Sequence, residues 1–199
     1  MTTNNKPTRA QQILEALAYQ LETHPGQRIT TAALAKEVGV SEAALYRHFP
    51  SKARMFEALI EFIEDTIFSL INRILEDHAS AHDRCQQSLT MLLGFSAKNP
   101  GLSRILVGDA LTGEHGRLRI RITQFYDRLE TQLKQVLREA ESKNELPVGH
   151  PSAAIANLLL ATVEGRMNQF VRSGFQQSPL ERWEQQWVLL STNLFPTNT

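Results

Sequence analysis

Residues 41–52 carry side chains that could contact a polyanion or the edges of bases. Arg47 can bond a guanine edge or a phosphate, and Glu42 can accept from a cytosine amino group. Tyr46, His48 and Lys52 are better suited to phosphate. Phosphate contacts set the register of a protein on a duplex, whereas base contacts set its sequence choice. Together these residue types offer the chemistry of DNA recognition.

Four neighbouring residues extend this surface. Thr30 and Thr31 stand at the expected N-terminus of a short helix, where free N–H groups and hydroxyls favour an anion. Ser41 can cap the following helix by accepting from its free N–H groups, and Ala43 faces outward beside Glu42. We therefore include these four residues among the candidate DNA contacts.

A helix-turn-helix is the element that must position these side chains. Gly39 falls between the two short helices, where a sharp turn often needs a positive φ that glycine adopts at little cost. The second helix of such a unit fits the major groove of B-DNA. In the alternative interpretation, Tyr46 and His48 only pack locally. The apolar residues that can fill one small shared core are Leu34, Ala35, Val38, Val40, Ala44, Leu45 and Phe49.

The segment that contains this unit resembles the signature of the TetR-type bacterial regulators. It reads VGVSEAALYRHFPSK. Tyr46, His48, Phe49 and Lys52 occupy the places of a tyrosine, a histidine, a phenylalanine and a lysine in that signature. The resemblance implies an all-α fold of nine helices, three in a DNA-binding head and six in a body that dimerises.

Composition sets limits on how such a protein would bind DNA. Lys+Arg and Asp+Glu both number 21, so the net charge is zero and bulk charge alone is a poor basis for binding. Residues 1–52 hold six basic and four acidic residues, and the rest of the chain holds 15 and 17. This small asymmetry has the sign expected of a DNA-reading head on a neutral body.

Other features of the sequence concern location. Cys85 is the single cysteine, so an intrachain disulfide is impossible, which fits a reducing cytosol. The N-terminus is polar, and the longest apolar stretch, residues 153–163, is too short to cross a bilayer. Strand-like alternation is absent. We expect an all-helical soluble protein of the cytoplasm.

Apolar residues that recur every three or four positions predict the helices. We expect disorder over residues 1–8 and two short helices within residues 30–49. The other expected helices cover residues 9–22, 52–77, 80–98, 100–111, 117–143, 152–172 and 178–194. The last of these is expected to open with a capping box at Ser178.

We expect two domains, a DNA-binding head over residues 1–52 and a dimerisation and partner-binding body over residues 53–199. One head reads only a few base pairs, so useful affinity requires two heads and a dimeric body. The last two helices have broad apolar faces that suit a dimer seam, although these faces could instead close the core of the monomer. The expected interface residues are Leu158, Thr162, Gly165, Trp183, Trp187 and Leu190.

Metal binding and catalysis have little support. His78 and His82 have the i, i+4 spacing of a zinc pair and lie near Cys85. However, the residues between them predict a junction between helices, so we expect a solvated loop. No catalytic triad, glycine-rich phosphate loop or pair of buried carboxylates is recognisable. We expect a protein that is not an enzyme and has neither a metal nor a cofactor.

A ligand-controlled repressor is the alternative function. TetR-type bodies often hold a small hydrophobic inducer between the fourth and eighth helices. The residues that could line such a cavity, or equally fill it as ordinary core, are Phe62, Phe68, Met91, Phe95, Phe125, Met167 and Phe170.

Four segments of the body resemble a narrower group, the nucleoid occlusion factors of the TetR-type family. They read MFEALIEFIEDTI, LLGFSAKNPGLSRIL, RLETQLKQVLRE and FVRSGF. The resemblance implies a nucleoid-associated factor that binds palindromic chromosomal sites as a dimer. On DNA it would engage the C-terminal tail of the tubulin-like division protein FtsZ and antagonise assembly of the division ring over the nucleoid.

The implied groove for the FtsZ tail lies between the helices expected at residues 52–77 and 80–98. Its implied residues are Phe62, Met91, Gly94, Lys98 and Asn99. Apolar side chains would form the floor, glycine would admit a peptide backbone, and Lys98 and Asn99 would supply polar groups at the rim. Leu70 stands where a basic residue is expected, which should weaken any acidic contact. In the alternative interpretation, the same residues are a packing seam in which Gly94 saves space.

Overall fold

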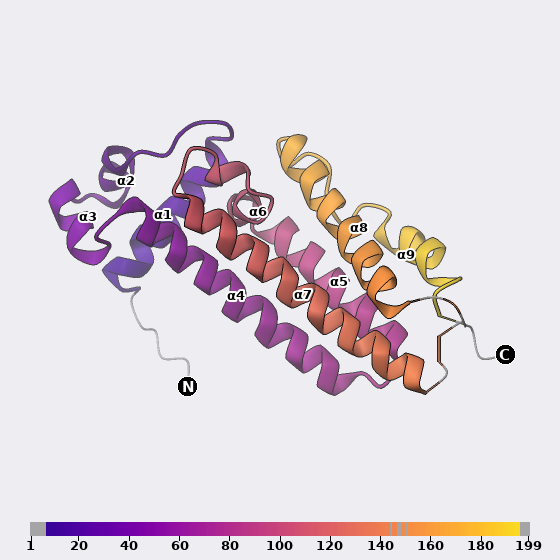
Figure 1. The fold of residues 1–199 in the computed structure, drawn as a ribbon. Helices are drawn as coiled ribbons and strands as arrows, with labels where there is room; N and C mark the ends of the chain where they lie inside the picture. Colours follow the sequence, from indigo (N-terminus) through magenta and orange to yellow (C-terminus); the bar gives the residue numbers. More distant parts are fainter. Residues whose placement is uncertain (1–6, 144, 147–148, 150, 196–199) are drawn as a thin grey trace, which may run out of the picture.

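The computed structural model describes residues 7–143, 145–146, 149 and 151–195 and consists of helices joined by short connections (Figure 1). Nine α-helices and one 3₁₀ turn lie within these residues, which confirms the expected all-α class and the number of helices. The elements are α1 (Arg9–Thr23), α2 (Thr31–Val38), α3 (Glu42–His48), α4 (Lys52–Asp77), α5 (Ala81–Lys98), α6 (Pro100–Leu106), η1 (Asp109–Leu111), α7 (Gly116–Ser142), α8 (Ser152–Arg172) and α9 (Trp183–Ser191).

The two short helices α2 and α3, at one end of the molecule, form the expected helix-turn-helix (Figure 1). Gly39 has φ 70° at the C-terminus of α2, and the Ser41 hydroxyl accepts from the backbone N–H of Ala44 to cap α3. Leu34 and Leu45 are fully buried, and the other apolar residues of the unit pack around them. The apolar spacing and the turn chemistry therefore predicted this unit correctly.

A long bundle forms the body. α4 continues from the head and packs against α5 and α7, and α5, α7 and α8 pack against one another (Figure 1). The amphipathic spacing of these helices places their apolar residues in one continuous core that extends into the head. Within the described part of the chain, no helix is long and apolar enough to cross a membrane.

The ends of three helices differ from expectation. Thr8 is ordered as the N-cap of α1, where it forms a capping box with Gln11, while residues 1–6 lie outside the described residues. α6 ends at Leu106 because Val107 and Gly108 turn the chain, and Gly108 has φ 78°. A separate 3₁₀ turn follows where the sixth helix was expected to continue.

The expected capping box at Ser178 is wrong, because α9 begins only at Trp183. The reason is a contact from α8: the buried guanidinium of Arg166 donates to the backbone carbonyls of Pro179 and Glu181. These carbonyls are therefore held outside a helix. Arg182, with φ 58°, completes the turn into α9.

The junction between head and body rests on the packing of α6 against α1. Gly101 on α6 lies so close to α1 that a Cβ placed on it would be 2.2 Å from the carbonyl oxygen of Ala18. Arg104, which is only 3% exposed, donates from Nη1 to the carbonyls of Leu21 (2.7 Å) and His24 (3.2 Å) at the C-terminus of α1. These contacts fix the first helix of the head on the body.

Substitution Gly101→Ala should lower the stability of the fold. Alanine favours a helix by roughly 0.5–1 kcal/mol, but the clash with the Ala18 backbone cannot be relieved by a side-chain rotation. We expect a net loss of about 1–3 kcal/mol in the free energy of unfolding, measured by urea titration. Gly116→Ala is the matched control, because a Cβ there meets nothing within 4 Å. Equal stability of the two variants would contradict the description of this junction.

Candidate functional site

The recognition helix α3 presents its polar face to solvent. Leu45 anchors the helix in the core, while Tyr46 is 43% exposed and Arg47 and His48 are also exposed. Ala43 lies on the same outer surface. The polar side chains of Tyr46, Arg47 and His48 are therefore not used to fill the core of the head.

Hydrogen bonds tie the start of α2 to α3. The hydroxyl of Thr31 donates to Oε2 of Glu42 (2.7 Å), and the Tyr46 hydroxyl lies 3.4 Å from Thr31 Oγ1. Thr30 caps α2 by accepting from the N–H of Ala33, which leaves its own proton available for a phosphate. Because a hydroxyl has a single proton, Thr31 can donate to phosphate only when it releases Glu42.

Lys52 is paired within the protein. Its Nζ lies 2.5 Å from Oε1 of Glu114, in the connection between η1 and α7, and 5.6 Å from the ring centre of Phe56. The two charged side chains are 17% and 12% exposed. Sequence reasoning assigned Lys52 to phosphate and could not find Glu114, because the pairing joins residues that are distant in the chain.

The residues implied for a peptide groove lie on α4, on α5 and directly after α5, and the two helices pack against each other. Phe62 on α4 is 53% exposed, Lys98 is exposed, and Met91 and Gly94 are partly exposed. A Cβ on Gly94 would meet nothing within 4 Å, so this glycine does not save space for a helix contact. The space above it is open to a ligand backbone.

Two other residues of this region differ in availability. One side-chain N–H of Asn99 donates to the carbonyl of Phe95 (2.8 Å), so the second N–H and the amide oxygen are left for a partner. Leu70 is 36% exposed on α4, about two turns beyond Phe62, and extends the apolar surface where a basic residue was expected.

The residues expected in a dimer seam are accessible on α8 but largely buried on α9. Leu158 is 49% exposed, Thr162 is partly exposed, and Gly165 is exposed with open space around it. Their spacing places them on one face of α8. This face of α8 is open in the single chain.

Trp183 and Trp187 are not part of such a surface, because they are 2% and 1% exposed within one chain. Their indole N–H groups donate to Thr90 Oγ1 (2.7 Å) and to His82 Nε2 (2.9 Å) on α5, which orients both rings inward. Leu190 is also partly buried against the core.

The exposed apolar residues of α9 are instead Val188 at 61% and Leu189 at 77%. Sequence reasoning missed this pair because the face that Trp183, Trp187 and Leu190 share was assigned to a second copy, whereas it packs on the core of the single chain.

The two histidines and the cysteine do not form a metal site. Among the described residues, no group of three or more His, Cys, Asp or Glu side chains could hold a metal ion. His82 lies in the first turn of α5 and bonds to Trp187, so the expected solvated loop is wrong for this residue. Burial raises the pKa of the Cys85 thiol to about 12, which keeps it protonated at neutral pH and unsuited to metal binding.

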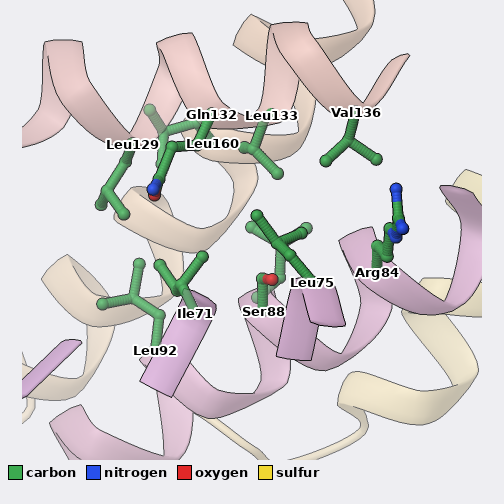
Figure 2. Close-up of a pocket in the computed structure, with 11 residues that line it drawn as sticks. Ile71, Leu75, Arg84, Ser88, Leu92, Leu129, Gln132, Leu133, Val136 and Leu160 are labelled. Carbon is green, nitrogen blue, oxygen red and sulfur yellow. The ribbon is translucent and has the colours of Figure 1, made fainter. Parts of the chain in front are cut away.

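A cavity lies between α4, α5, α7 and α8, and Figure 2 shows the side chains that line it. Its volume is about 20 Å³, which is room for little more than a water molecule and far below the size of a drug-sized ligand site. Ser88 Oγ and Gln132 Oε1 line it and have no hydrogen-bond partner. The structure therefore offers little support for a large apolar inducer here.

Most of the aromatic and methionine residues considered for an inducer cavity lie in the core. Phe62 is exposed and Met91 partly exposed, whereas the others are buried. Phe68 and Phe125, for example, contact each other edge to face at 5.5 Å between ring centres. The interpretation as core is the one that fits the buried members of this set.

Two known protein families match different parts of the chain. Residues 13–59 match the family described as "Bacterial regulatory proteins, tetR family". Residues 79–195 match the family described as "Tetracyclin repressor-like, C-terminal domain", whose short label is SlmA-like.

Similar proteins cover nearly the whole length. "Nucleoid occlusion factor SlmA" of Marinomonas sp. is 56% identical over 191 residues, which span 96% of this chain and 97% of that protein. The protein of the same name from Shewanella woodyi is 55% identical and covers 98% of both chains. That of Alteromonas mediterranea is 57% identical over 92% of this chain and 94% of its own.

Solved structures show the same fold at low identity. The MbdR regulator of Azoarcus sp. CIB superposes with a TM-score of 0.80 at 16% identity, over 94% of this chain and all of that one. FadR of Bacillus subtilis, solved in complex with stearoyl-CoA, superposes with a TM-score of 0.73 at 18% identity, over 92% of this chain and 98% of that one. At these identities the likeness concerns the fold alone.

Proposed function

Because the chain belongs to the TetR-type family and, within it, to the SlmA family of nucleoid occlusion factors, we propose that it binds palindromic chromosomal sites as a dimer and antagonises FtsZ ring assembly over the nucleoid. DNA binding and dimer formation are general features of the family. The particular contacts with DNA, with a second copy and with the FtsZ tail are the parts that we propose. The protein would act in the cytoplasm, on the nucleoid.

The observation that carries the proposal is the exposed polar edge of α3. Arg47 and His48 are exposed next to Tyr46, and α2 supplies Thr30 at its N-terminus. A helix that keeps these groups free of internal ion pairs can offer them to base edges and phosphates. Arg47 is our candidate for base recognition, and Thr30, Tyr46 and His48 are candidates for the phosphates.

The apolar surface on α8 and α9 supports dimerisation. Leu158, Val188 and Leu189 are each about half exposed or more, and Gly165 permits close approach of a second helix. We propose that this corrected set, together with Thr162, meets its copy across a two-fold axis.

The outer faces of α4 and α5 support binding of the FtsZ tail. An extended segment could place apolar side chains on Phe62 and Met91, pass its backbone over Gly94, and meet Lys98 at the rim. The exposed Leu70 adds apolar contact at the far end, so the groove should favour apolar over acidic residues there.

Substitution Arg47→Ala should weaken binding to a duplex that the wild-type protein selects from a randomised pool. We expect a loss of about 1–3 kcal/mol, measured by fluorescence anisotropy, with relaxed preference at one base position. Arg138→Ala is the control, because Arg138 is exposed on α7 and lies outside the head. Unchanged affinity in the Arg47 variant would remove this residue from the DNA contact.

Substitution Leu189→Arg should convert the dimer into monomers, because a charge at the centre of an apolar seam is not paired there. Sedimentation velocity should show the change in mass, and Leu158→Arg should have the same effect. Ile120→Arg is the control, since Ile120 is 61% exposed on α7. A Leu189→Arg protein that remains dimeric would show that α9 lies outside the interface.

Substitutions Phe62→Ala and Lys98→Ala should abolish binding of a peptide with the sequence of the FtsZ tail and leave DNA affinity unchanged. Both measurements can use fluorescence anisotropy, with Ile120→Ala and Lys143→Ala as controls at other exposed positions. If both variants bind the tail as the wild type does, the groove lies elsewhere. Sedimentation of FtsZ filaments, with and without the selected duplex, then tests whether DNA is required for the antagonism.

A further inference from the structure

The Lys52–Glu114 pair joins the DNA-binding side of the molecule to the body. Lys52 is the first residue of α4 and follows His48, the last residue of α3, by four positions. Glu114 lies 62 residues further along, between η1 and α7. The pair therefore connects the residues just after the recognition helix to the connection between η1 and α7.

The surroundings of Lys52 explain why it takes an internal partner. A cation in the first turn of a helix faces the positive end of the helix dipole, which is unfavourable. Burial to 17% exposure also removes most of its water. The carboxylate of Glu114 offsets both effects.

From this geometry we propose that Glu114 competes with DNA for Lys52 and thereby lowers the affinity of the protein for a duplex. The inference rests on the proposed function, since it requires a phosphate to approach the end of α3. An ammonium group has three N–H donors but one unit of charge. A phosphate that reaches Nζ comes close to the Glu114 carboxylate, and the two anions repel each other.

The pair thus reduces the contribution of Lys52 to binding, and a bound duplex favours separation of Lys52 from Glu114. Bulk charge gives this protein little help, since its net charge is zero. A single intramolecular carboxylate can for that reason have a measurable effect on affinity.

The test is a double-mutant cycle on the full-length protein. Glu114→Gln keeps the shape of the side chain and removes its charge. Its affinity for a duplex selected by the wild-type protein should be roughly three- to fivefold tighter at low ionic strength, and Lys52→Met should bind more weakly. In the Lys52→Met background, Glu114→Gln should have no further effect.

Two controls accompany the cycle. Glu141→Gln removes the same charge near the far end of α7 and should leave the affinity unchanged. Thermal unfolding of each variant verifies that it is folded, and Glu114→Asp provides a second variant that keeps the charge and should remain close to the wild type in affinity.

The outcomes separate this inference from the proposed function. Weaker binding by Glu114→Gln, or equal tightening with and without Lys52, would overturn the competition while leaving DNA recognition by Arg47 intact. If the wild-type protein enriches no duplex at all, the proposed function and the inference both fail.

Discussion

The buried guanidinium of Arg104 holds the C-terminal end of α1, and the position of the DNA-binding head depends on this contact. The last carbonyls of a helix have no partner within it, and a positive charge there also meets the negative end of the helix dipole. Arg104 supplies both a hydrogen-bond donor and a positive charge at this end of α1. It donates to the carbonyls of Leu21 and His24 and is itself paired with Asp109.

The same junction explains how one chain can present several surfaces. α2 and α3 lie at one end of the molecule and α9 lies away from them (Figure 1). In the proposed function, a duplex at the first end leaves α8 free to meet a second copy. The outer faces of α4 and α5 stay open as well. α4 begins directly after the head and carries Phe62 of the proposed peptide groove. It therefore takes part in both DNA binding and peptide binding in the proposed function.

Local sequence patterns predicted the features that depend on local chemistry. The bounds of α8, the positive φ of Gly39 and the cap at Ser41 follow from spacing, turn geometry and capping, and all were correct. The start of α9 was wrong because Arg166, from another helix, holds the carbonyls that a helix would have used. The two tryptophans were assigned to a dimer surface because an apolar helix face can cover either a second copy or the core, and their bonds to Thr90 and His82 on α5 show that it covers the core.

The residues of the candidate site also divide into those that local patterns predict and those that depend on the tertiary fold. The exposed edge of α3 could be anticipated, because an amphipathic helix with Leu45 inside must place Arg47 outside. The partner of Lys52 could not, because no local pattern relates it to Glu114 across the fold. The proposed groove for the FtsZ tail rests on resemblance rather than on spacing, and the open space at Gly94 is the structural detail that supports the proposal.

The protonated, fully buried thiol of Cys85 has a practical consequence for spectroscopy. As it is the single cysteine of the chain, the native protein already behaves as a cysteine-free background toward maleimide and methanethiosulfonate reagents. One cysteine introduced on an exposed helix would accept a spin label or a fluorophore at a unique position. In a two-fold assembly, that one label would report the separation of its two copies directly.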